Sequence, residues 1–371
     1  MMNRNPRYER HYVLKNFGVS AQQKLGGASV LVVGAGGLGC PVLQYLAAAG
    51  VGKIGISDGD SVALSNLQRQ VLFVTSDVGK PKAKIASERL KNLNPEIEIL
   101  EFGFHIDNKN AMEIFPKFDI IVDCTDNFAS RYLINDACVL LDKPLVFGAI
   151  FRYEGQVAVF NLSGETGRKT NYRDLFPIPP NANEAQDCNE AGVLGVLPGT
   201  IGTLMANETI KIITGLGSDL RNKLFTINVL DYQNYTLEIS PNPKAKVPEN
   251  VNAFLETDYE WLCGNKIEGI AGIFAEDLLD YLKSDGILAI DVRENHELPK
   301  ADFAHERFPL SELKNELPDI DSRNIVVFCQ SGKRSLEAAK LLRESLPTNT
   351  KIAHLKGGII ALQEFLHGKT S

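Results

Sequence analysis

Short apolar segments alternate with longer amphipathic segments over the first 150 residues of the chain. Runs rich in Val, Ile, Leu and Phe predict buried strands at residues 28–34, 53–58, 97–102, 118–126 and 144–150. Apolar residues at helical spacing between these runs predict helices, for example over residues 39–50 and 81–93. Strands and helices in such alternation form a doubly wound, mostly parallel sheet, so we expect a Rossmann-like α/β domain.

The pattern changes after residue 150. Residues 154–161 and 224–240 are strand-like but do not alternate with helical segments, which predicts an antiparallel extension of the sheet. Between them, residues 164–191 are rich in Pro, Asn and Gly and are expected to form a long surface loop.

A second alternation of strands and helices begins near residue 266, after a segment at residues 241–249 whose composition is typical of a linker. About a hundred residues suffice for a separate small α/β domain. We therefore expect a first domain over residues 1–245, a linker over residues 246–265 and a second domain over residues 266–371.

Composition narrows the class of protein. The 371 residues are 44% hydrophobic and 23% charged, as in an ordinary globular protein. The net charge of -7 argues against nucleic acid as a partner, and no apolar run suggests a secretory signal or a membrane span. Six cysteines without a C-x-x-C pair are typical of free thiols in the reducing cytoplasm. The six histidines show no metal-ligand spacing, so all are expected to be structural or surface residues.

A glycine-rich segment, VLVVGAGGLG, follows the first predicted strand. It places Gly34, Gly36 and Gly39 in G-x-G-x-x-G register before a helix. Glycine lets the backbone approach a phosphate, and the helix N-terminus offers free N–H groups to it. Asp58 ends the second strand, where a carboxylate can accept hydrogen bonds from ribose hydroxyls. Taken alone, this pattern favours NAD over a purely structural tight turn.

Two cations beyond Asp58 change that interpretation. Arg69 and Lys82 supply positive charge for which hydride transfer has no obvious need. An enzyme that expels pyrophosphate does need it, because negative charge builds on the leaving oxygens. Asp123 and Asp126 lie at the carboxyl end of the fourth strand, where open α/β sheets bind ligands. A carboxylate there can hold Mg²⁺ against the phosphates.

Several long motifs resemble the MoeB/ThiF group of ubiquitin-activating-like adenylyltransferases. They are RYERH, GAGGLG, DGDSVALSNLQRQ, VGKPKAK, DCTDN, EGQVAVF and DCNEAGVLGVLPGTIG. The resemblance covers residues 7–243. It implies that ATP and Mg²⁺ are used to join the C-terminal glycine of a small ubiquitin-like sulfur carrier, ending in Gly-Gly, to AMP.

The resemblance also implies the roles of particular residues. The implied ATP site contains the glycine loop, with Gly37 as one of its residues. It also contains Asp58, Ser65, Asn66, Leu67, Gln68, Arg69, Lys82, Asp126 and Asn127. Asp126 is the implied magnesium ligand. Arg10 matches an arginine that reaches the site from the partner subunit, which implies a homodimer. Cys188 matches a cysteine able to form a covalent link to the carrier, and a surface thiol without that role is an equal alternative.

This chain departs from the family at the structural zinc site. Relatives carry two C-x-x-C pairs, where this chain has Asn171 and Asp174 and then Ala245 and Pro248. Tetrahedral thiolate ligation is impossible with these residues. We therefore predict a protein without zinc, and the sequence does not indicate what holds these segments instead.

The C-terminal hundred residues carry a reactive cysteine. LAIDVRENHE and FCQSGKRS resemble a rhodanese domain over residues 266–368, with Cys329 as the persulfide cysteine. Backbone N–H groups, Lys333, Arg334 and the following helix N-terminus are expected to stabilise its anion. A cysteine phosphatase would need arginine six residues after the cysteine, where this chain has Ser335.

Together these features predict an adenylyltransferase fused to a sulfurtransferase. Sulfur taken from a cysteine desulfurase or thiosulfate would pass through Cys329 to the carrier as a thiocarboxylate. A MoaD-like carrier of molybdenum cofactor biosynthesis is favoured, and a ThiS-like carrier is the alternative. Two other hypotheses stay open: an NAD-dependent oxidoreductase with a regulatory rhodanese module, and a non-catalytic scaffold that binds the carrier.

Overall fold

The computed structural model describes residues 5–164, 167–179, 192–259, 269–283, 286–295, 297–314, 320 and 324–368. Cys188 and Cys263 lie outside these ranges. The chain divides into two compact units, Met1–Cys263 and Gly264–Ser371. Each unit contains its own sheet and its own apolar cores.

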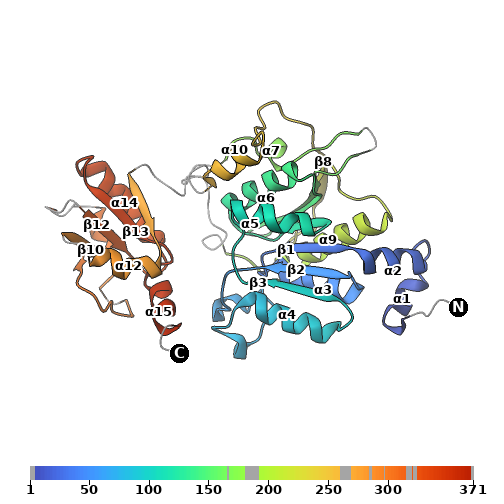
Figure 1. The fold of residues 1–371 in the computed structure, drawn as a ribbon, viewed down its shortest axis with the longest axis horizontal. Coiled ribbons are helices and arrows are strands. Elements are labelled where there is room, and N and C mark those ends of the chain that lie inside the picture. The colour runs from blue at the N-terminus through green and yellow to red at the C-terminus, as the bar shows by residue number, and fades with distance from the viewer. Residues whose placement is uncertain are drawn as a thin grey trace. The chain divides into compact units, whose positions relative to one another are not determined.

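The sheet of the first unit has the strand order β3-β2-β1-β4-β5-β6-β7-β8 (Figure 1). Its strands are β1 Ser29–Val33, β2 Lys53–Ser57, β3 Glu98–Phe102, β4 Ile120–Asp123, β5 Leu145–Phe151, β6 Glu154–Phe160, β7 Lys223–Asn228 and β8 Asn234–Glu238. The first five are parallel, and β6, β7 and β8 are added in antiparallel pairing. This arrangement confirms the predicted doubly wound sheet with an antiparallel extension. The chain reverses its direction of winding between β1 and β4, where such folds bind ligands.

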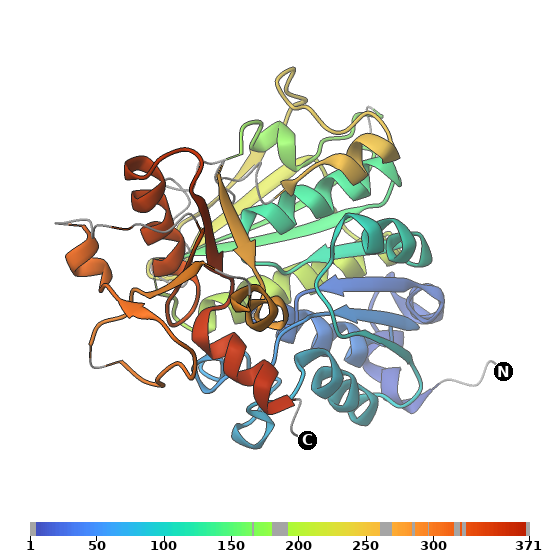
Figure 2. The same ribbon diagram turned by 60° about the vertical axis from the view of Figure 1, so that its left-hand side comes forward.

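Helices cover both faces of this sheet (Figure 2). Val30 and Val32 of β1 belong to one apolar core, and Leu31 and Val33 belong to the other, as expected for a strand buried on both faces. The first core contains α3 Gly39–Ala49, α4 Lys82–Leu93 and α9 Val196–Thr214, and the second contains α5 Asn108–Ile114, α6 Phe128–Leu140 and α10 Val251–Glu256. Shorter or peripheral helical segments are η1 Pro6–Tyr8, α1 Glu9–Tyr12, α2 Gly18–Gly27, η2 Leu64–Asn66, η3 Thr75–Asp77, η4 Phe115–Lys117 and α7 Tyr172–Leu175. No described helix could cross a membrane.

Part of the expected surface loop at residues 164–191 is buried instead. Tyr172, at the start of α7, is 1% exposed, and its ring centroid lies 5.1 Å from that of Tyr132 and 5.2 Å from that of Phe147. Aromatic packing against α6 and β5 therefore fixes this segment. Residues 180–191 lie outside the described part.

The predicted linker also begins later than expected. Phe254 of α10 is fully buried against the second core, and Tyr259 is 4% exposed. The Tyr259 hydroxyl donates a hydrogen bond of 2.7 Å to Asp136, which also accepts two hydrogen bonds from Arg173. Residues 246–259 are therefore part of the first unit, and residues 260–268 lie outside the description.

A carboxylate joins the two segments in which relatives carry cysteine pairs. Asp174 Oδ1 accepts a hydrogen bond of 2.7 Å from the backbone N–H of Asn242, and Oδ2 accepts one of 2.8 Å from the backbone N–H of Asn171. The described side chains contain no group of three or more His, Cys, Asp or Glu residues placed to hold a metal. Hydrogen bonds to Asp174 therefore connect α7 to the segment that follows β8.

The second unit is a small parallel α/β domain, as predicted. Its sheet has the order β11-β10-β12-β13-β9, built from β9 Ile270–Ile273, β10 Ile287–Asp291, β11 Glu306–Arg307, β12 Asn324–Phe328 and β13 Lys351–Leu355. One face packs against α13 Leu310–Leu313 and α14 Lys333–Ser345, and the other against α12 Ala275–Leu282 and α15 Gly358–Gly368. The turn between β12 and α14 carries Cys329.

Candidate active sites

The glycine loop connects β1 to α3. Gly34 has a φ of +95°, and a Cβ atom on it would lie 2.9 Å from the carbonyl oxygen of Cys124. A Cβ atom on Gly39 would lie 2.0 Å from the Gly34 carbonyl oxygen. Both positions thus require glycine because the loop passes directly against neighbouring backbone. The result is a bare backbone surface at the N-terminus of α3, which suits an anion.

A pocket of about 1000 Å³, including its open mouth, lies beside this loop at the carboxyl ends of β1, β2 and β4. Asp58, after β2, forms part of its wall and is 7% exposed. Its carboxylate accepts hydrogen bonds of 2.8 Å from the backbone N–H groups of Ala35 and Asp60. These bonds tie the glycine loop to β2. Burial raises the pKa of Asp58, and the charge of Lys82 opposes this shift.

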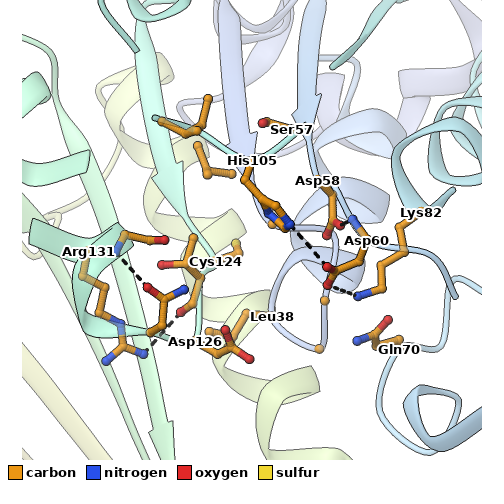
Figure 3. A pocket seen from close by; sticks show the side chains of 18 of the residues that line it. Leu38, Ser57, Asp58, Asp60, Gln70, Lys82, His105, Cys124, Asp126 and Arg131 are labelled. Atoms are coloured by element: carbon orange, nitrogen blue, oxygen red, sulfur yellow. Dashed lines mark hydrogen bonds and ion pairs between the residues drawn. The ribbon is translucent and has the colours of Figure 1, made fainter. Parts of the chain in front are cut away.

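Lys82, Asp60 and His105 form a chain of charges along one wall (Figure 3). The Lys82 ammonium is 2.8 Å from Asp60 Oδ2, and His105 Nε2 is 3.4 Å from Asp60 Oδ1. Lys82 is 5% exposed, whereas His105 and Asp60 lie toward solvent. The hydrogen bond with His105 holds the pKa of Asp60 below its ordinary value, and the same bond raises the pKa of His105. A buried cation is therefore held in place by an ionised carboxylate.

The opposite wall comes from the segment between β4 and α6, which carries Asp126, and from the start of α6, which carries Arg131 (Figure 3). Asn127 caps α6 by accepting a hydrogen bond of 2.8 Å from the backbone N–H of Ser130. Arg131 donates to the carbonyl oxygen of Thr125 at 3.3 Å. The Asp126 carboxylate is exposed, and no hydrogen bond or ion pair engages it among the described residues. An unengaged carboxylate in a pocket suits a hard cation such as Mg²⁺.

Asp123 lies beneath this wall, at the end of β4. Its Oδ1 accepts hydrogen bonds from the Thr125 backbone N–H and hydroxyl, whereas Oδ2 is buried without a partner in the described structure. Burial raises the pKa of Asp123. Asp123 does not line the pocket, so it shapes the turn that carries Asp126.

Most of the residues expected at the nucleotide site line this pocket, and some do not. The pocket contains Gly34, Gly36, Gly37, Asp58, Arg69, Lys82, Asp126 and Asn127. It does not contain Gly39, Ser65, Asn66, Leu67, Gln68 or Arg10. Ser65 instead accepts a hydrogen bond of 3.1 Å from Arg69 through its carbonyl, and Asn66 accepts one of 3.1 Å from the Ala63 backbone. These residues shape the loop that positions Arg69.

Cys329 is the centre of the second site. Its side chain is fully buried, and its sulfur accepts a hydrogen bond of 3.1 Å from the backbone N–H of Gly332. The Ser335 hydroxyl lies 3.7 Å from the sulfur and donates to the Gly332 carbonyl at 2.9 Å. The Ile359 backbone N–H donates to the Cys329 carbonyl at 2.8 Å, so α15 holds the loop from outside. The loop therefore directs a backbone N–H at the sulfur and places a hydroxyl beside it.

Arg334, which is expected to help stabilise the Cys329 anion, also has a carboxylate partner. Its guanidinium forms two hydrogen bonds of 2.6 Å to the two carboxylate oxygens of Glu297. Its charge is thus offset by a partner, and it is not a free cation beside Cys329. The side chain of Lys333 lies outside the described part of the structure.

Family models match both units. The ThiF family model matches residues 8–248, about two thirds of the chain. The chain belongs to the ThiF family. A rhodanese-like domain model matches residues 274–364, which contain Cys329 and its loop. The ThiF-family pocket and the rhodanese loop thus lie in separate units of one polypeptide.

Relatives named for these activities cover most of the chain. The probable adenylyltransferase/sulfurtransferase MoeZ of Mycobacterium tuberculosis is 40% identical over 96% of this chain and 92% of its own length. The sulfur carrier protein adenylyltransferase of Thermus thermophilus is 48% identical over 70% of this chain and 96% of its own length. A probable molybdopterin-synthase adenylyltransferase of Porphyra purpurea is 37% identical over 95% of this chain and 91% of its own length. This ThiF-family chain is an adenylyltransferase and a sulfurtransferase.

Solved structures agree on the fold of the first unit. A crystal structure of E. coli MccB with ATP is 26% identical to this chain and has a TM-score of 0.57. The similarity covers 66% of this chain and 74% of MccB. The ThiF-family fold therefore accounts for the first unit.

Sequence reasoning missed several pocket residues of this ThiF-family site. They are Asp60, Gln70, His105, Thr125, Ser130 and Arg131. Asp60 and Gln70 had a signal, because they stand inside the quoted motif DGDSVALSNLQRQ. His105 had none: it is exposed at the surface, as expected, and it also pairs with Asp60 at the pocket. The Gln70 side-chain oxygen is buried without a partner in the described structure, so it is free to meet a ligand.

The remaining described cysteines are packing residues. Cys40, Cys124 and Cys138 are buried at 6% exposure or less. Burial raises the pKa of the Cys40 thiol to about 12 and those of Cys124 and Cys138 well above the ordinary value. Neutral buried thiols are poor nucleophiles.

Proposed function

We propose that this enzyme uses ATP to adenylylate the C-terminal glycine of a ubiquitin-like sulfur carrier protein, and then converts that glycine to a thiocarboxylate with sulfur carried on Cys329. The observation that carries the proposal is the charge arrangement around the glycine loop. Buried Lys82 and neighbouring Arg69 line one pocket with the unengaged carboxylate of Asp126. Hydride transfer needs no such arrangement, and a scaffold would not need to keep it.

Each pocket residue has a task in adenylation. The bare glycine backbone and the α3 N-terminus receive phosphate oxygens, and Asp58 receives ribose hydroxyls. A carboxylate oxygen of the carrier attacks the α-phosphorus, and pyrophosphate leaves. Lys82 and Arg69 stabilise the charge that builds on the leaving oxygens, and Asp60 holds Lys82 in place beforehand. Mg²⁺ bound at Asp126 would neutralise phosphate charge.

Sulfur transfer follows from the product of adenylation. A carboxylate resists nucleophiles, whereas an acyl adenylate has a good leaving group. In the direct route the terminal sulfur of a Cys329 persulfide attacks the glycyl carbonyl carbon and AMP leaves. In the alternative route the Cys188 thiolate first displaces AMP to form a thioester, and the persulfide then attacks that carbonyl carbon and releases the Cys188 thiolate. Two thiols then reduce the resulting acyl disulfide: the first releases the thiocarboxylate and forms a mixed disulfide with Cys329, and the second resolves that disulfide and regenerates the Cys329 thiolate.

We propose a MoaD-like carrier over a ThiS-like one. The fusion to a rhodanese unit favours this choice, and it is supported by the Porphyra purpurea relative, named as a molybdopterin-synthase adenylyltransferase. We further propose a homodimer in the cytoplasm. Arg10 is exposed on α1, outside the pocket of its own chain, and is free to reach a second subunit.

ATP–pyrophosphate exchange tests this function directly. We expect exchange with the full chain only when a carrier ending in Gly-Gly is present, and faster exchange with a MoaD-type than with a ThiS-type carrier. Removal of the final Gly-Gly should abolish it. Exchange that is absent with both carriers, together with quenching of NADH fluorescence on mixing, would replace this proposal with the oxidoreductase.

A further inference from the structure

The ion pair between Arg334 and Glu297 lies beside the persulfide loop. Both carboxylate oxygens of Glu297 accept from the guanidinium at 2.6 Å, a two-point contact between side chains that are 33% and 20% exposed. Glu297 also accepts a hydrogen bond of 2.8 Å from the Glu294 backbone N–H, which fixes the carboxylate from its own side. A planar, two-point ion pair of this kind is stronger and better oriented than an ordinary surface pair.

Arg334 stands in the persulfide loop between Gly332 and Ser335, whose backbone N–H and hydroxyl lie 3.1 and 3.7 Å from the Cys329 sulfur. The hydrogen bonds to Glu297 are the main reason that the pKa of Arg334 is raised, and the charge of the Cys329 thiolate adds to that shift. Arg334 therefore lies where a charged group on a sulfur donor would come when the donor's sulfur meets Cys329.

A second arginine beside the loop is also engaged. Arg293 is fully buried, and it forms hydrogen bonds of 2.9 and 2.7 Å to the two oxygens of Asp291. It also donates to the carbonyl of Pro299 at 2.6 Å and lies 3.4 Å from the Gln330 amide oxygen. The donors of Arg293 are thus used inside the unit, so Arg293 offers no free guanidinium to a sulfur donor, whereas Arg334 is partly exposed.

Sulfur donors differ in whether they need a free cation, such as an unpaired Arg334, near the loop. The Cys329 thiolate attacks the outer sulfur of thiosulfate, the sulfur–sulfur bond breaks, and sulfite leaves with the bonding electrons. With an alkyl persulfide, the thiolate attacks the terminal sulfur and an alkyl thiolate leaves instead. Both steps yield the Cys329 persulfide with charge conserved. Only thiosulfate brings a doubly charged anion, and that anion needs a free cation near the loop.

We propose that Glu297 is a specificity-determining residue of the sulfurtransferase unit, which occupies Arg334 and thereby selects alkyl persulfides, such as a persulfide on a donor protein's cysteine, over thiosulfate. The inference rests on the proposed function only in that Cys329 is the sulfur-accepting residue. Because Arg334 holds the pKa of Glu297 at about 2, the carboxylate stays ionised at every working pH. Thiosulfate therefore meets a guanidinium whose charge is already neutralised by Glu297, where it would need a free one.

The test compares two donors with the full chain. Thiosulfate and 2-hydroxyethyl persulfide, which has no sulfonate group, are each assayed for sulfur transfer to cyanide. Glu297→Gln should raise the ratio of kcat/KM for thiosulfate to kcat/KM for the alkyl persulfide by about 10-fold or more, the size of one charge-assisted contact. Glu294→Gln is the matched control, because it removes a charge from the same loop without breaking the two-point contact, and it should change the ratio much less.

The double variant Glu297→Gln with Arg334→Gln should lose the gain, because the gain depends on a freed guanidinium. An unchanged ratio in Glu297→Gln, or a gain that persists in the double variant, would overturn the proposal. A fall with both donors equally would assign Glu297 to the stability of the loop and would also overturn it. If the proposed function is wrong because Cys329 does not accept the sulfur, Cys329→Ala would still transfer sulfur from both donors. This result separates a failure of the proposed function from a failure of the proposal for Glu297.

Discussion

At the scale of single residues, Lys82 shows how the fold prepares a cation for a phosphate. The side chain is 5% exposed and its ammonium is held 2.8 Å from Asp60. It is therefore in place before the charge of the transition state develops, so its contribution should appear in turnover more than in binding.

We expect Lys82→Ala to lower kcat for adenylation about 10²-fold or more. Lys84 lies on the same helix but is exposed and outside the pocket, so Lys84→Ala should leave kcat nearly unchanged. Pyrophosphate exchange at varied ATP concentrations separates the two effects. If Lys82→Ala raised only KM for ATP, the role of Lys82 would be ground-state binding.

His105 gives the pocket a dependence on pH. Its pKa is raised above the ordinary 6.5, mainly by the hydrogen bond to Asp60, with Asp58 adding to the shift and Lys82 opposing it. A group whose pKa is raised on folding stabilises the fold below its unfolded pKa and loses this effect as pH rises through its folded pKa. Wild type should therefore be more stable than His105→Gln at pH about 5.5, and the difference should vanish by pH about 9. Urea unfolding at the two pH values measures this; an equal difference at both would contradict the ion pair.

What the sequence predicts at this scale depends on how local the signal is. Gly34, Asp58 and Lys82 stand in contiguous motifs whose geometry follows from a strand, a turn and a helix. The contact between Asp60 and His105 joins residues that follow neighbouring strands β2 and β3. Only the pairing of those strands brings the two side chains together, so no local pattern reveals it.

At the scale of elements, hydrogen bonds connect α7 to the segment after β8, and Asp174 is their common acceptor. Asp174→Ala should leave two backbone N–H groups without their partner and lower the free energy of unfolding by about 1–3 kcal/mol. Glu113 on α5 is an exposed control, and Glu113→Ala should change stability by less than about 0.5 kcal/mol. Chemical unfolding compares the two variants, and equal small effects would show that Asp174 does not hold these segments together.

The apolar runs predicted β1, β2, β4 and β5 because strands buried on both faces must be apolar throughout. The edge strand β3 was also expected to be buried, but it is exposed at Glu98 and Glu101. The short helices α7 and α10 were missed for the opposite reason. Each is only a turn or two long, and its position depends on a single buried ring, Tyr172 or Phe254, packed against a distant core. The composition of residues 164–191 suggested a loop and that of residues 246–265 suggested a linker. Packing of Tyr172 and Phe254 against the core instead holds parts of both segments in place.

At the scale of the whole molecule, we expect the adenylation site to be shared between the two subunits of a dimer. Arg10 and Arg69 should serve one adenylation site from two subunits. Arg10→Ala and Arg69→Ala should each lose activity, whereas a mixture should regain part of it in dimers that carry one intact site. Pyrophosphate exchange on refolded mixtures measures this. No recovery in a mixture shown to contain mixed dimers would place each site within one chain.

The central claim for the whole molecule is that one unit activates the carrier and the other supplies its sulfur through Cys329. The most direct measurement is mass spectrometry of the carrier after reaction with ATP, a sulfur donor and a thiol reductant, without free sulfide. Cys329→Ala should catalyse pyrophosphate exchange at the wild-type rate, because the adenylation pocket is in the other unit. It should yield only the unmodified carboxylate, whereas wild type yields the mass increase that marks one oxygen replaced by sulfur. A normal yield of thiocarboxylate from Cys329→Ala under these conditions would contradict the account.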